Sequence, residues 1–306
     1  MKPQETNHLR HFRTLSGMHQ ELNLPGPAHP LISLLDYREV EITRQMLSTG
    51  FMMDFYHITY NDSSGCRMKY GQTTYDFNEA GMCFTAPGQP LAGIQSAGTP
   101  SGFTLLIHPD FFRGYPLERK IRNYGFFSYL IHEALYLSER EKNIMTNIAG
   151  IINDELKTSI DDLSHDVLIS QLELLLTYSQ RFYKRQFITR KIINTDLLSR
   201  MELLLDEYFN SEKAVIEGIP TVKYLSDQLK VSPRYLGDML RSVTGLNTQQ
   251  HIHLKLIEKA KEKLSATHLT VSEIAYELGF EHPQSFSKFF RSKTNSSPLE
   301  FKQTFN

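Results

Sequence analysis

One pattern occurs twice in the C-terminal third of the chain, and this repeat constrains the fold more than any other feature. The two copies begin at Thr221 and Thr270, which are 49 residues apart, whereas Arg241 and Arg291 in their second halves are 50 residues apart. The second copy therefore has one additional residue in its middle. Apolar residues at helical spacing on both sides of that point predict a helix, a tight turn and a second helix in each copy.

The second helix of each copy, which we call the reading helix, is expected to contact DNA, because this arrangement places a helix in a major groove. Apolar residues of each reading helix are predicted to face the core and leave a polar outward face. On the first reading helix the outward residues are Arg234, Tyr235, Gly237, Asp238 and Arg241. On the second they are Pro283, Gln284, Ser285, Lys288 and Arg291.

These outward side chains have the chemistry that base edges and phosphates require. Arg and Lys can read guanine, Gln can read adenine, and Asp can accept a hydrogen bond from cytosine although it repels phosphate. Arg241 and Arg291 lie near the ends of their helices and are predicted to contact phosphates. Since Gly237 has no side chain and Asp238 repels phosphate, we expect the first copy to make fewer base contacts than the second.

A long helix is predicted between the two copies, over residues 247–265, where no Gly or Pro interrupts the sequence. About 19 residues at ~1.5 Å each span roughly 28 Å. Neighbouring major-groove segments lie roughly 34 Å apart, so this helix could hold the reading helices in successive grooves. Lys255, Lys259 and Lys263 recur along it, either as a solvated charged face or as phosphate contacts.

The rest of the chain predicts a different architecture, so the fold class is α+β. Residues 1–30 are expected to form an N-terminal arm, and residues 31–135 contain short apolar runs separated by turn residues, which predict β structure. Residues 136–195 change to helical period and predict two helices and a linker, the first of them capped by Ser138 and Glu141. Residues 196–306 read as entirely helical.

Composition excludes several classes of protein. The net charge is -1, but residues 218–306 contain 12 Lys and Arg against 8 Asp and Glu, a local excess of 12 - 8 = 4. The sequence shows no secretory leader and no apolar stretch of about 20 residues, so we expect a cytoplasmic protein without membrane contact. Cys66 and Cys83 are expected to be reduced and buried, with a redox-sensing pair as the alternative.

Residues 196–306 resemble the DNA-binding domain of the AraC/XylS family of bacterial transcription regulators. The resemblance is most specific in the second copy, at a set of matching positions: Ile274, Ala275, Gly279, Phe280, Ser285, Phe286, Ser287, Phe289, Phe290, Arg291, Pro298 and Phe301. Asn295 stands where the family usually has Gly, and Phe301-Lys302 replaces the usual Tyr-Arg. Because Asn tolerates a left-handed conformation, we expect the turn to be kept.

The resemblance also implies an N-terminal cupin-like barrel that binds a small-molecule effector. The segment that carries it is a strand followed by a turn, with Gly81, Pro87, Gly88 and Pro90. In the strand near residue 57, one register would point Phe55, His57 and Thr59 into a ligand pocket. The opposite register would point Tyr56, Ile58 and Tyr60 inward. No pair of His residues with a nearby carboxylate emerges, so we expect no metal, no cofactor, no catalytic residues and no enzymatic activity.

Operator DNA, a small-molecule effector and a second copy of the chain are the partners that the resemblance implies, with RNA polymerase as a further candidate. Dimerisation would use the helices within residues 136–195, and activation is the expected mode of regulation. An alternative is a constitutive DNA-binding regulator whose N-terminal domain only dimerises. A DNA-repair sensor with a thiol acceptor is disfavoured, because two cysteines cannot supply a cysteine-rich zinc module.

Overall fold

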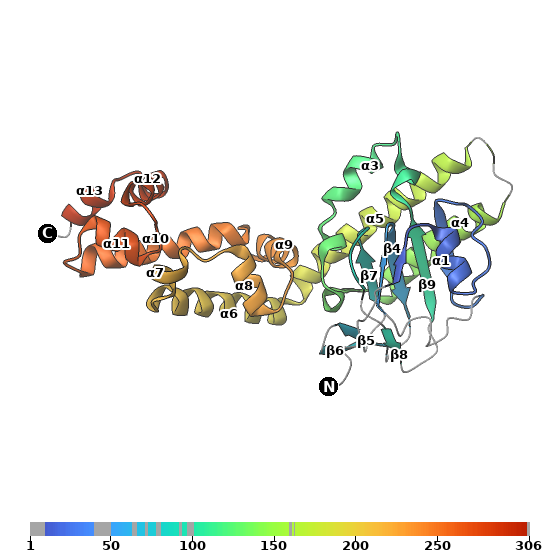
Figure 1. The fold of residues 1–306 in the computed structure, drawn as a ribbon, viewed down its shortest axis with the longest axis horizontal. Helices are drawn as coiled ribbons and strands as arrows, with labels where there is room; N and C mark the ends of the chain where they lie inside the picture. The colour runs from blue at the N-terminus through green and yellow to red at the C-terminus, as the bar shows by residue number, and fades with distance from the viewer. Residues whose placement is uncertain are drawn as a thin grey trace, which may run out of the picture. The chain divides into compact units, whose positions relative to one another are not determined.

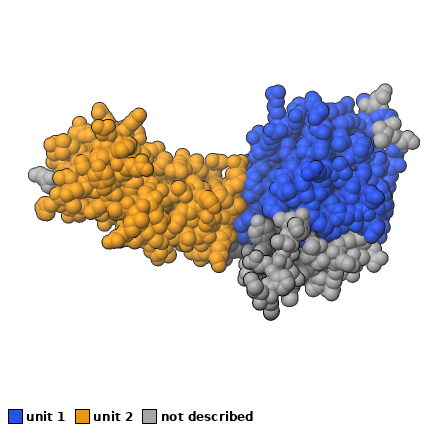
Figure 2. Space-filling view, viewed as in Figure 1, with its two compact units in different colours: residues 1–186 blue, residues 187–306 orange. Residues whose placement is uncertain are grey.

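The computed structural model describes residues 10–39, 50–62, 66–70, 73–77, 81–91, 94–96, 101–158, 161 and 163–304. The chain divides into two compact units, residues 1–186 and 187–306, which are coloured separately in Figure 2. The first unit combines helices and sheets and the second is helical in its described part, which confirms the α+β class. Among the described residues, no helix combines the length and the apolarity that crossing a bilayer would require.

The central element of the first unit is a five-stranded antiparallel sheet (Figure 1). Its strands, in spatial order, are β10 (Leu135–Tyr136), β7 (Gly81–Thr85), β4 (Tyr56–Asn61), β9 (Gly102–Ile107) and β2 (Ile32–Asp36). Two smaller sheets pair β1 (Arg10–Phe12) with β3 (Phe51–Met53), and β5 (Cys66–Tyr70) with β6 (Thr73–Phe77) and β8 (Ile94–Ser96). The closure of these strands into a cupin-like barrel stays a prediction.

One face of the central sheet packs on aromatic residues and on the long helices α4 (Glu139–Lys157) and α5 (Ser164–Thr189). The Tyr56 ring meets the ring of Phe127 at 4.9 Å, and Phe84 meets Tyr183 of α5 at 6.1 Å. Short helices follow β9 and supply much of this aromatic layer: η1 (Pro109–Phe112), α3 (Leu117–Lys120), η2 (Ile121–Asn123), η3 (Gly125–Ser128) and η4 (Ile131–Glu133). The side chains of Tyr56, Ile58 and Tyr60 therefore lie on the face of β4 that meets the helices.

The predicted cap of α4 is confirmed and also connects two helices. The Glu141 carboxylate accepts a hydrogen bond from the Ser138 backbone N–H at 2.9 Å. The same carboxylate pairs with Arg185 of α5 at 2.7 Å, and Arg185 also donates to the carbonyl of Tyr136 in β10. One acidic side chain thus begins α4 and ties it to α5 and the edge of the sheet.

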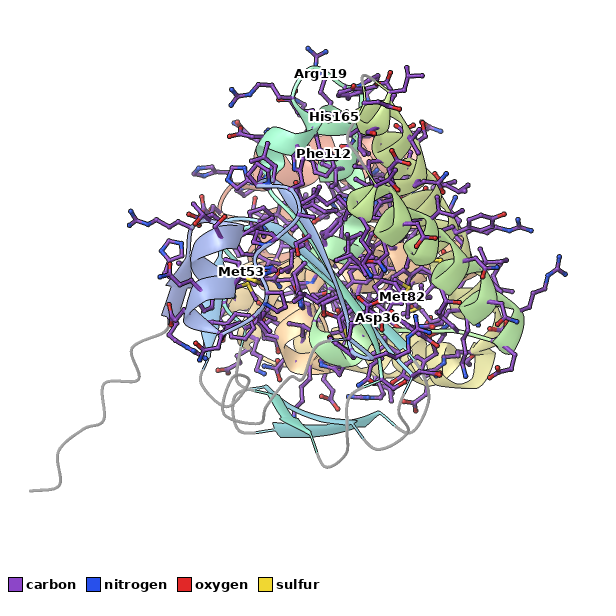
Figure 3. All side chains as sticks on the ribbon, turned by 90° about the vertical axis from the view of Figure 1, so that its right-hand side faces the viewer. Asp36, Met53, Met82, Phe112, Arg119 and His165 are labelled. Atoms are coloured by element: carbon purple, nitrogen blue, oxygen red, sulfur yellow. The ribbon has the colours of Figure 1, made fainter. Side chains whose placement is uncertain are left out.

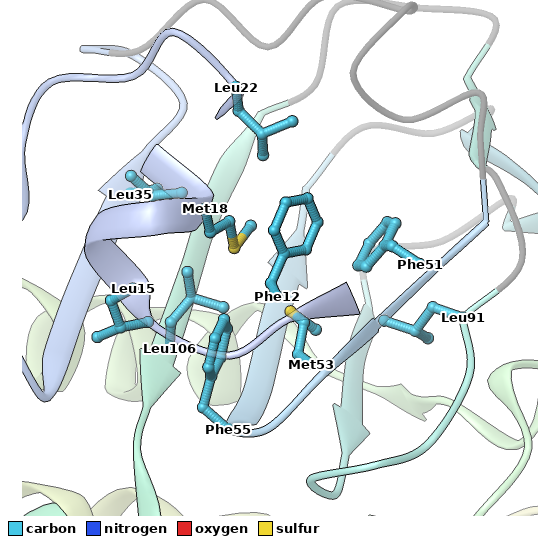
Figure 4. Close-up of a cluster of buried hydrophobic side chains, with 10 residues drawn as sticks. All are labelled: Phe12, Leu15, Met18, Leu22, Leu35, Phe51, Met53, Phe55, Leu91 and Leu106. Atoms are coloured by element: carbon cyan, nitrogen blue, oxygen red, sulfur yellow. The ribbon is translucent and has the colours of Figure 1, made fainter. Parts of the chain in front are cut away.

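The opposite face of the sheet packs on α1 (Leu15–Glu21) and the two-stranded sheet. Ten buried side chains form this cluster (Figure 4): Phe12, Leu15, Met18, Leu22, Leu35, Phe51, Met53, Phe55, Leu91 and Leu106. Figure 3 shows Met53 on the side of α1 and Met82 on the side of the long helices. The sheet therefore separates two apolar layers.

The second unit contains eight helices in its described part. They are α6 (Lys191–Asn210), α7 (Lys213–Glu217), α8 (Val222–Leu229), α9 (Pro233–Thr244), α10 (Thr248–Ala266), α11 (Val271–Glu277), α12 (Pro283–Thr294) and α13 (Pro298–Gln303). The repeat corresponds to α8 with α9 and to α11 with α12. Apolar side chains from both pairs and from α10 are buried, among them Leu225, Leu236, Ile252, Ile274 and Phe286.

Candidate DNA-binding site

The two copies of the repeat begin and turn in the same way. Thr221 and Thr270 each accept a backbone N–H from three residues ahead, at 3.1 and 3.2 Å, and so cap α8 and α11. After these helices, Lys230 and Gly279 both adopt left-handed conformations, with φ of 59° and 87°. These two residues are still 49 apart, whereas the prolines that open α9 and α12 are 50 apart. The additional residue therefore lies in the turn, as predicted.

The ends of the reading helices α9 and α12 also match. Gly245 and Asn295 follow them with φ of 80° and 61°. The hydroxyl groups of Thr244 and Thr294 each donate to a carbonyl four residues earlier at 2.8 Å. The expectation that Asn295 keeps the left-handed turn is confirmed.

The turn of the second copy is packed more tightly than that of the first. A Cβ atom at Gly279 would lie 2.6 Å from the carbonyl carbon of Gly218 and 2.7 Å from the carbonyl oxygen of Ala214. Both are backbone atoms, so they cannot rotate away. Gly279 is therefore required for two reasons, its left-handed backbone and the close approach of the segment after α7.

The outward side of α9 carries three charged side chains in a row. Arg234 and Arg241 are exposed, and Asp238 lies between them. The Asp238 carboxylate is 3.2 Å from Nε of Arg234 and 3.8 Å from Nη1 of Arg241. Since the side chain of Asp238 is only 23% exposed, it occupies the base of this row and the two guanidinium groups flank it.

The outward side of α12 has the same spacing with different charges. Gln284, Ser285, Lys288 and Arg291 are all exposed, as predicted from the sequence. On the inner side Phe286 and Phe290 are fully buried, whereas Phe289 is half-buried. The structure thus brings these four polar side chains together on one side of α12.

Tyr235 differs from the other predicted DNA contacts. Its side chain is half-buried, and its ring packs edge-on against Phe187 with 5.2 Å between the ring centroids. Gly237 also does not point fully outward, because a Cβ atom there would meet Thr248 Oγ1 of α10 at 3.7 Å. A DNA contact by Tyr235 stays a prediction.

The connecting helix α10 has the predicted length of 19 residues. Three of its four lysines have a role that neither sequence-based interpretation included. Lys255 pairs with Asp206 of α6 at 2.8 Å, Lys259 donates to Asn210 at 2.9 Å, and Lys263 pairs with Glu277 of α11 at 2.6 Å. Their side chains are 11 to 27% exposed, so they join α10 to neighbouring helices.

These partners could not be found from local sequence. Asp206 lies 49 residues before Lys255 (255 - 206 = 49), and no spacing rule connects them. The hydrogen bond from Lys255 lowers the pKa of the Asp206 carboxyl, and this effect outweighs burial, which would raise that pKa. The charge of Asp206 is therefore matched in the folded unit.

A second candidate site lies on the α1 face of the central sheet. There a chain of hydrogen-bonded polar groups runs from β4 through β9 to Tyr37, which follows β2. His57 Nε2 lies 2.8 Å from the Thr59 hydroxyl, which lies 3.0 Å from the Thr104 hydroxyl. The Tyr37 hydroxyl completes the chain by bonding to Thr104. Burial lowers the pKa of His57 to about 4, so the imidazole is neutral near pH 7.

Phe55 shares this face but lies in the apolar cluster, fully buried beside Leu106 (Figure 4). Cys83 is paired in register with Thr59, and its side chain is half-buried and forms no disulfide. The side chain of Cys66 lies outside the described residues, so the redox alternative stays open. Ligand contact by Phe55, His57 and Thr59 also stays a prediction.

Known proteins match part of the chain. A family model described as a helix-turn-helix domain matches residues 225–304. The uncharacterized HTH-type transcriptional regulator YfiF of Bacillus subtilis (strain 168) is 26% identical over 164 residues, 54% of this chain and 49% of YfiF. The HTH-type transcriptional activator RhaS of Escherichia coli is 29% identical over 143 residues, 46% of each chain.

The helical unit therefore carries an AraC-type helix-turn-helix domain. Among solved structures, the C-terminal domain of the response regulator yesN from Fusobacterium nucleatum is 26% identical with a TM-score of 0.31, over 35% of this chain and 98% of that one. This chain spans about half the length of the curated relatives it matches. The match to the family model begins within the first copy of the repeat and includes the whole of the second.

Proposed function

We propose that this chain is a sequence-specific DNA-binding transcription regulator of the AraC/XylS family that reads duplex DNA with α9 and α12. The observation that carries the proposal is the duplicated row of exposed polar side chains, at matching positions of two helices joined by one unbroken helix. At ~1.5 Å per residue, the 19 residues of α10 span roughly 28 Å. This length suits two reading helices in successive major grooves.

The charge distribution fits such a role. Arg234, Arg241, Lys288 and Arg291 are exposed cations on the two reading helices. Neutralisation of phosphates by these groups would supply affinity that falls with salt, whereas base choice would come from the few side chains that reach the groove. Lys255, Lys259 and Lys263 of α10 are already paired within the unit and are not assigned to this surface.

The proposal is tested by selecting duplexes from a random pool with the purified full-length protein. We expect enrichment of a defined sequence, and binding to it that weakens steeply as salt rises. Recovery of no sequence preference after repeated rounds, with the protein folded, would contradict the proposal.

For the first unit we propose a small-molecule effector site on the α1 face of the sheet, at His57 and Thr59. Within the described part of the chain, Nδ1 of the buried His57 has no hydrogen-bond partner. A buried polar atom without a partner is unfavourable, so a ligand group that bonds to it would stabilise the site. A thermal-shift screen with sugars, aromatic acids and fatty acids tests this: a hit that His57→Gln abolishes supports sensing.

If no compound shifts the unfolding temperature, the alternative of a constitutive regulator is favoured. In either case we propose that the protein is a homodimer through α4 and α5. Ile151 of α4 and Val167 and Leu174 of α5 expose 47%, 36% and 41% of their surface, so both helices offer apolar side chains to a second copy.

One relative, RhaS, is named a transcriptional activator. We therefore propose activation through RNA polymerase as the mode of action of this chain. A ligand would act by shifting the equilibrium between arrangements of the dimer or its domains. Transcription from a promoter that carries the selected duplex, measured with purified polymerase, would rise on addition of the protein; a fall would indicate repression instead.

A further inference from the structure

The two reading helices differ in charge at one equivalent position. With the offset of 50 residues, Arg234 corresponds to Gln284, Asp238 to Lys288, and Arg241 to Arg291. The middle of the exposed row is therefore an acid in α9 and a base in α12. Counting charged residues within the helices, α9 carries 2 - 1 = +1, and α12, with Lys288, Arg291 and Lys293, carries +3.

Asp238 acts on both arginines of its row. One carboxylate oxygen lies 3.2 Å from Arg234 Nε, and the other lies 3.8 Å from Arg241 Nη1. Exposed ion pairs contribute little to the stability of a protein, so this arrangement matters little for folding. Its main effect is on the field at the α9 surface and on the directions in which the two guanidinium groups point.

We infer that Asp238 is a specificity-determining residue, which weakens sequence-independent binding of Arg241 to phosphate and positions Arg234 for a base edge. This inference rests on the proposed DNA-binding function. The α12 helix, with no acid, would supply most of the electrostatic affinity together with its own base contacts. The contacts of α9, though fewer, would depend more strongly on the DNA sequence.

Two physical effects support the assignment. A carboxylate near the DNA backbone repels phosphate, and each phosphate contact that a protein gains steepens the dependence of log binding constant on log salt by about 0.9. A guanidinium group held by a carboxylate also has fewer orientations open to it, and bidentate reading of guanine depends on the orientation of its planar fork.

The test compares Asp238→Asn with the unchanged full-length protein on two duplexes, the selected sequence and a scrambled sequence of equal length and composition. Binding is followed by fluorescence anisotropy over a series of salt concentrations. For Asp238→Asn we expect a salt slope on the scrambled duplex steeper by about 1 to 2, and about tenfold tighter binding to it near 0.1 M salt. The ratio of specific to non-specific affinity should fall about tenfold.

Two further variants separate this role from a general charge effect. Glu217→Gln makes the same change in net charge at an exposed position of α7, which contacts α6 and α11. It should leave the slope and the ratio within twofold of the unchanged protein. Asp238→Glu keeps the carboxylate and should keep the shallow slope, which a purely structural role would not predict.

The inference is overturned if Asp238→Asn and Glu217→Gln change the slope and the ratio equally, or if Asp238→Asn changes neither. It is also overturned if Asp238→Asn weakens binding to both duplexes alike while the protein stays folded, because Asp238 would then support affinity. Failure of the proposed function looks different, since the unchanged protein would then select no duplex.

Discussion

At the scale of single residues, the two copies of the repeat are alike in sequence but unequal in the demands they make. Lys230 and Gly279 hold the same left-handed position, yet only Gly279 lies against the backbone of Gly218 and Ala214. The glycine in the second copy is therefore fixed by packing as well as by backbone conformation. In the first copy a lysine is tolerated at the equivalent position.

Gly279→Ala is expected to destabilise the helical unit by about 2 to 3 kcal/mol, because it adds a Cβ atom in a left-handed conformation and in contact with backbone. Urea unfolding followed by circular dichroism measures the change. Gly237→Ala is the matched control: its Cβ atom has room beside Thr248, and loss of a helical glycine should stabilise by about 0.5 to 1 kcal/mol. Equal stabilities for the two variants would contradict this account of Gly279.

His57 gives a prediction about pH. Burial lowers its pKa to about 4, from an ordinary value of 6.5. As pH falls, His57 therefore takes up a proton at a higher pH in the unfolded chain than in the folded one. The stability that the neutral imidazole of His57 contributes is therefore complete above pH 6.5, and it is lost as pH falls toward 4. Between pH 7 and pH 5 the unchanged protein should lose about 2 kcal/mol more than His57→Gln does.

The free energies of unfolding of both proteins at the two pH values test this expectation. An identical loss for the two would mean that His57 titrates near its ordinary value. The chain of hydroxyl groups next to the imidazole would then have to be hydrated rather than buried.

At the scale of elements, the sequence predicted what depends on local pattern. The helix pairs, their caps and the one-residue difference in the turns follow from spacing within about 25 residues, because helix periodicity and caps are local signals. The length of α10 follows from the same reasoning. What the sequence could not supply was the partner of each exposed-looking side chain.

Two examples show why. The lysines of α10 have the spacing of a solvated face, yet Lys255 and Lys263 pair with Asp206 and Glu277 from other helices. Tyr235 has the position of a DNA contact, yet its ring packs on Phe187, 48 residues earlier (235 - 187 = 48). Both contacts depend on tertiary packing, which the local sequence does not encode.

The register of β4 could not be predicted for a related reason. Aromatic residues occur on both faces, Phe55 on one and Tyr56 and Tyr60 on the other, so the pattern does not identify the face that meets a ligand pocket. In the structure the Tyr56 face meets the aromatic layer below α5, and the His57 face carries the polar chain. The sequence therefore allows either Phe55, His57 and Thr59 or the Tyr56 set to line a ligand pocket.

The helices α4 and α5 carry the prediction for assembly. Leu174→Glu places a charge in the exposed apolar surface of α5 and should weaken a dimer at least tenfold, because the charge would have to be desolvated at the interface. Sedimentation velocity over a range of concentrations measures this. Leu203→Glu, on α6, changes a leucine that is 62% exposed and should leave the dimer intact. A monomer at all concentrations for the unchanged protein would contradict dimerisation through these helices.

At the scale of the whole molecule, the chain combines two different units. Residues 187–306 carry the two reading helices with their exposed polar side chains, and residues 1–186 carry hydrogen-bonded polar groups within an apolar face of the sheet. The overall charge of -1 conceals this division, since the exposed cations of α9 and α12 are concentrated in one unit. A regulator that binds DNA with one unit and a small molecule with the other needs such a division. We propose above all that the exposed polar side chains of α9 and α12 contact DNA.

The most direct test of that claim is the binding of two variants to the selected duplex, measured by gel shift at a fixed salt concentration. Lys288→Ala removes an exposed cation from the middle of the α12 row and should weaken specific binding by about 1 to 3 kcal/mol, roughly tenfold or more. Gly237→Ala changes a residue that faces Thr248 and should bind within about twofold of the unchanged protein. The reverse ranking, with Lys288→Ala unaffected and Gly237→Ala impaired, would contradict the assignment of this surface to DNA.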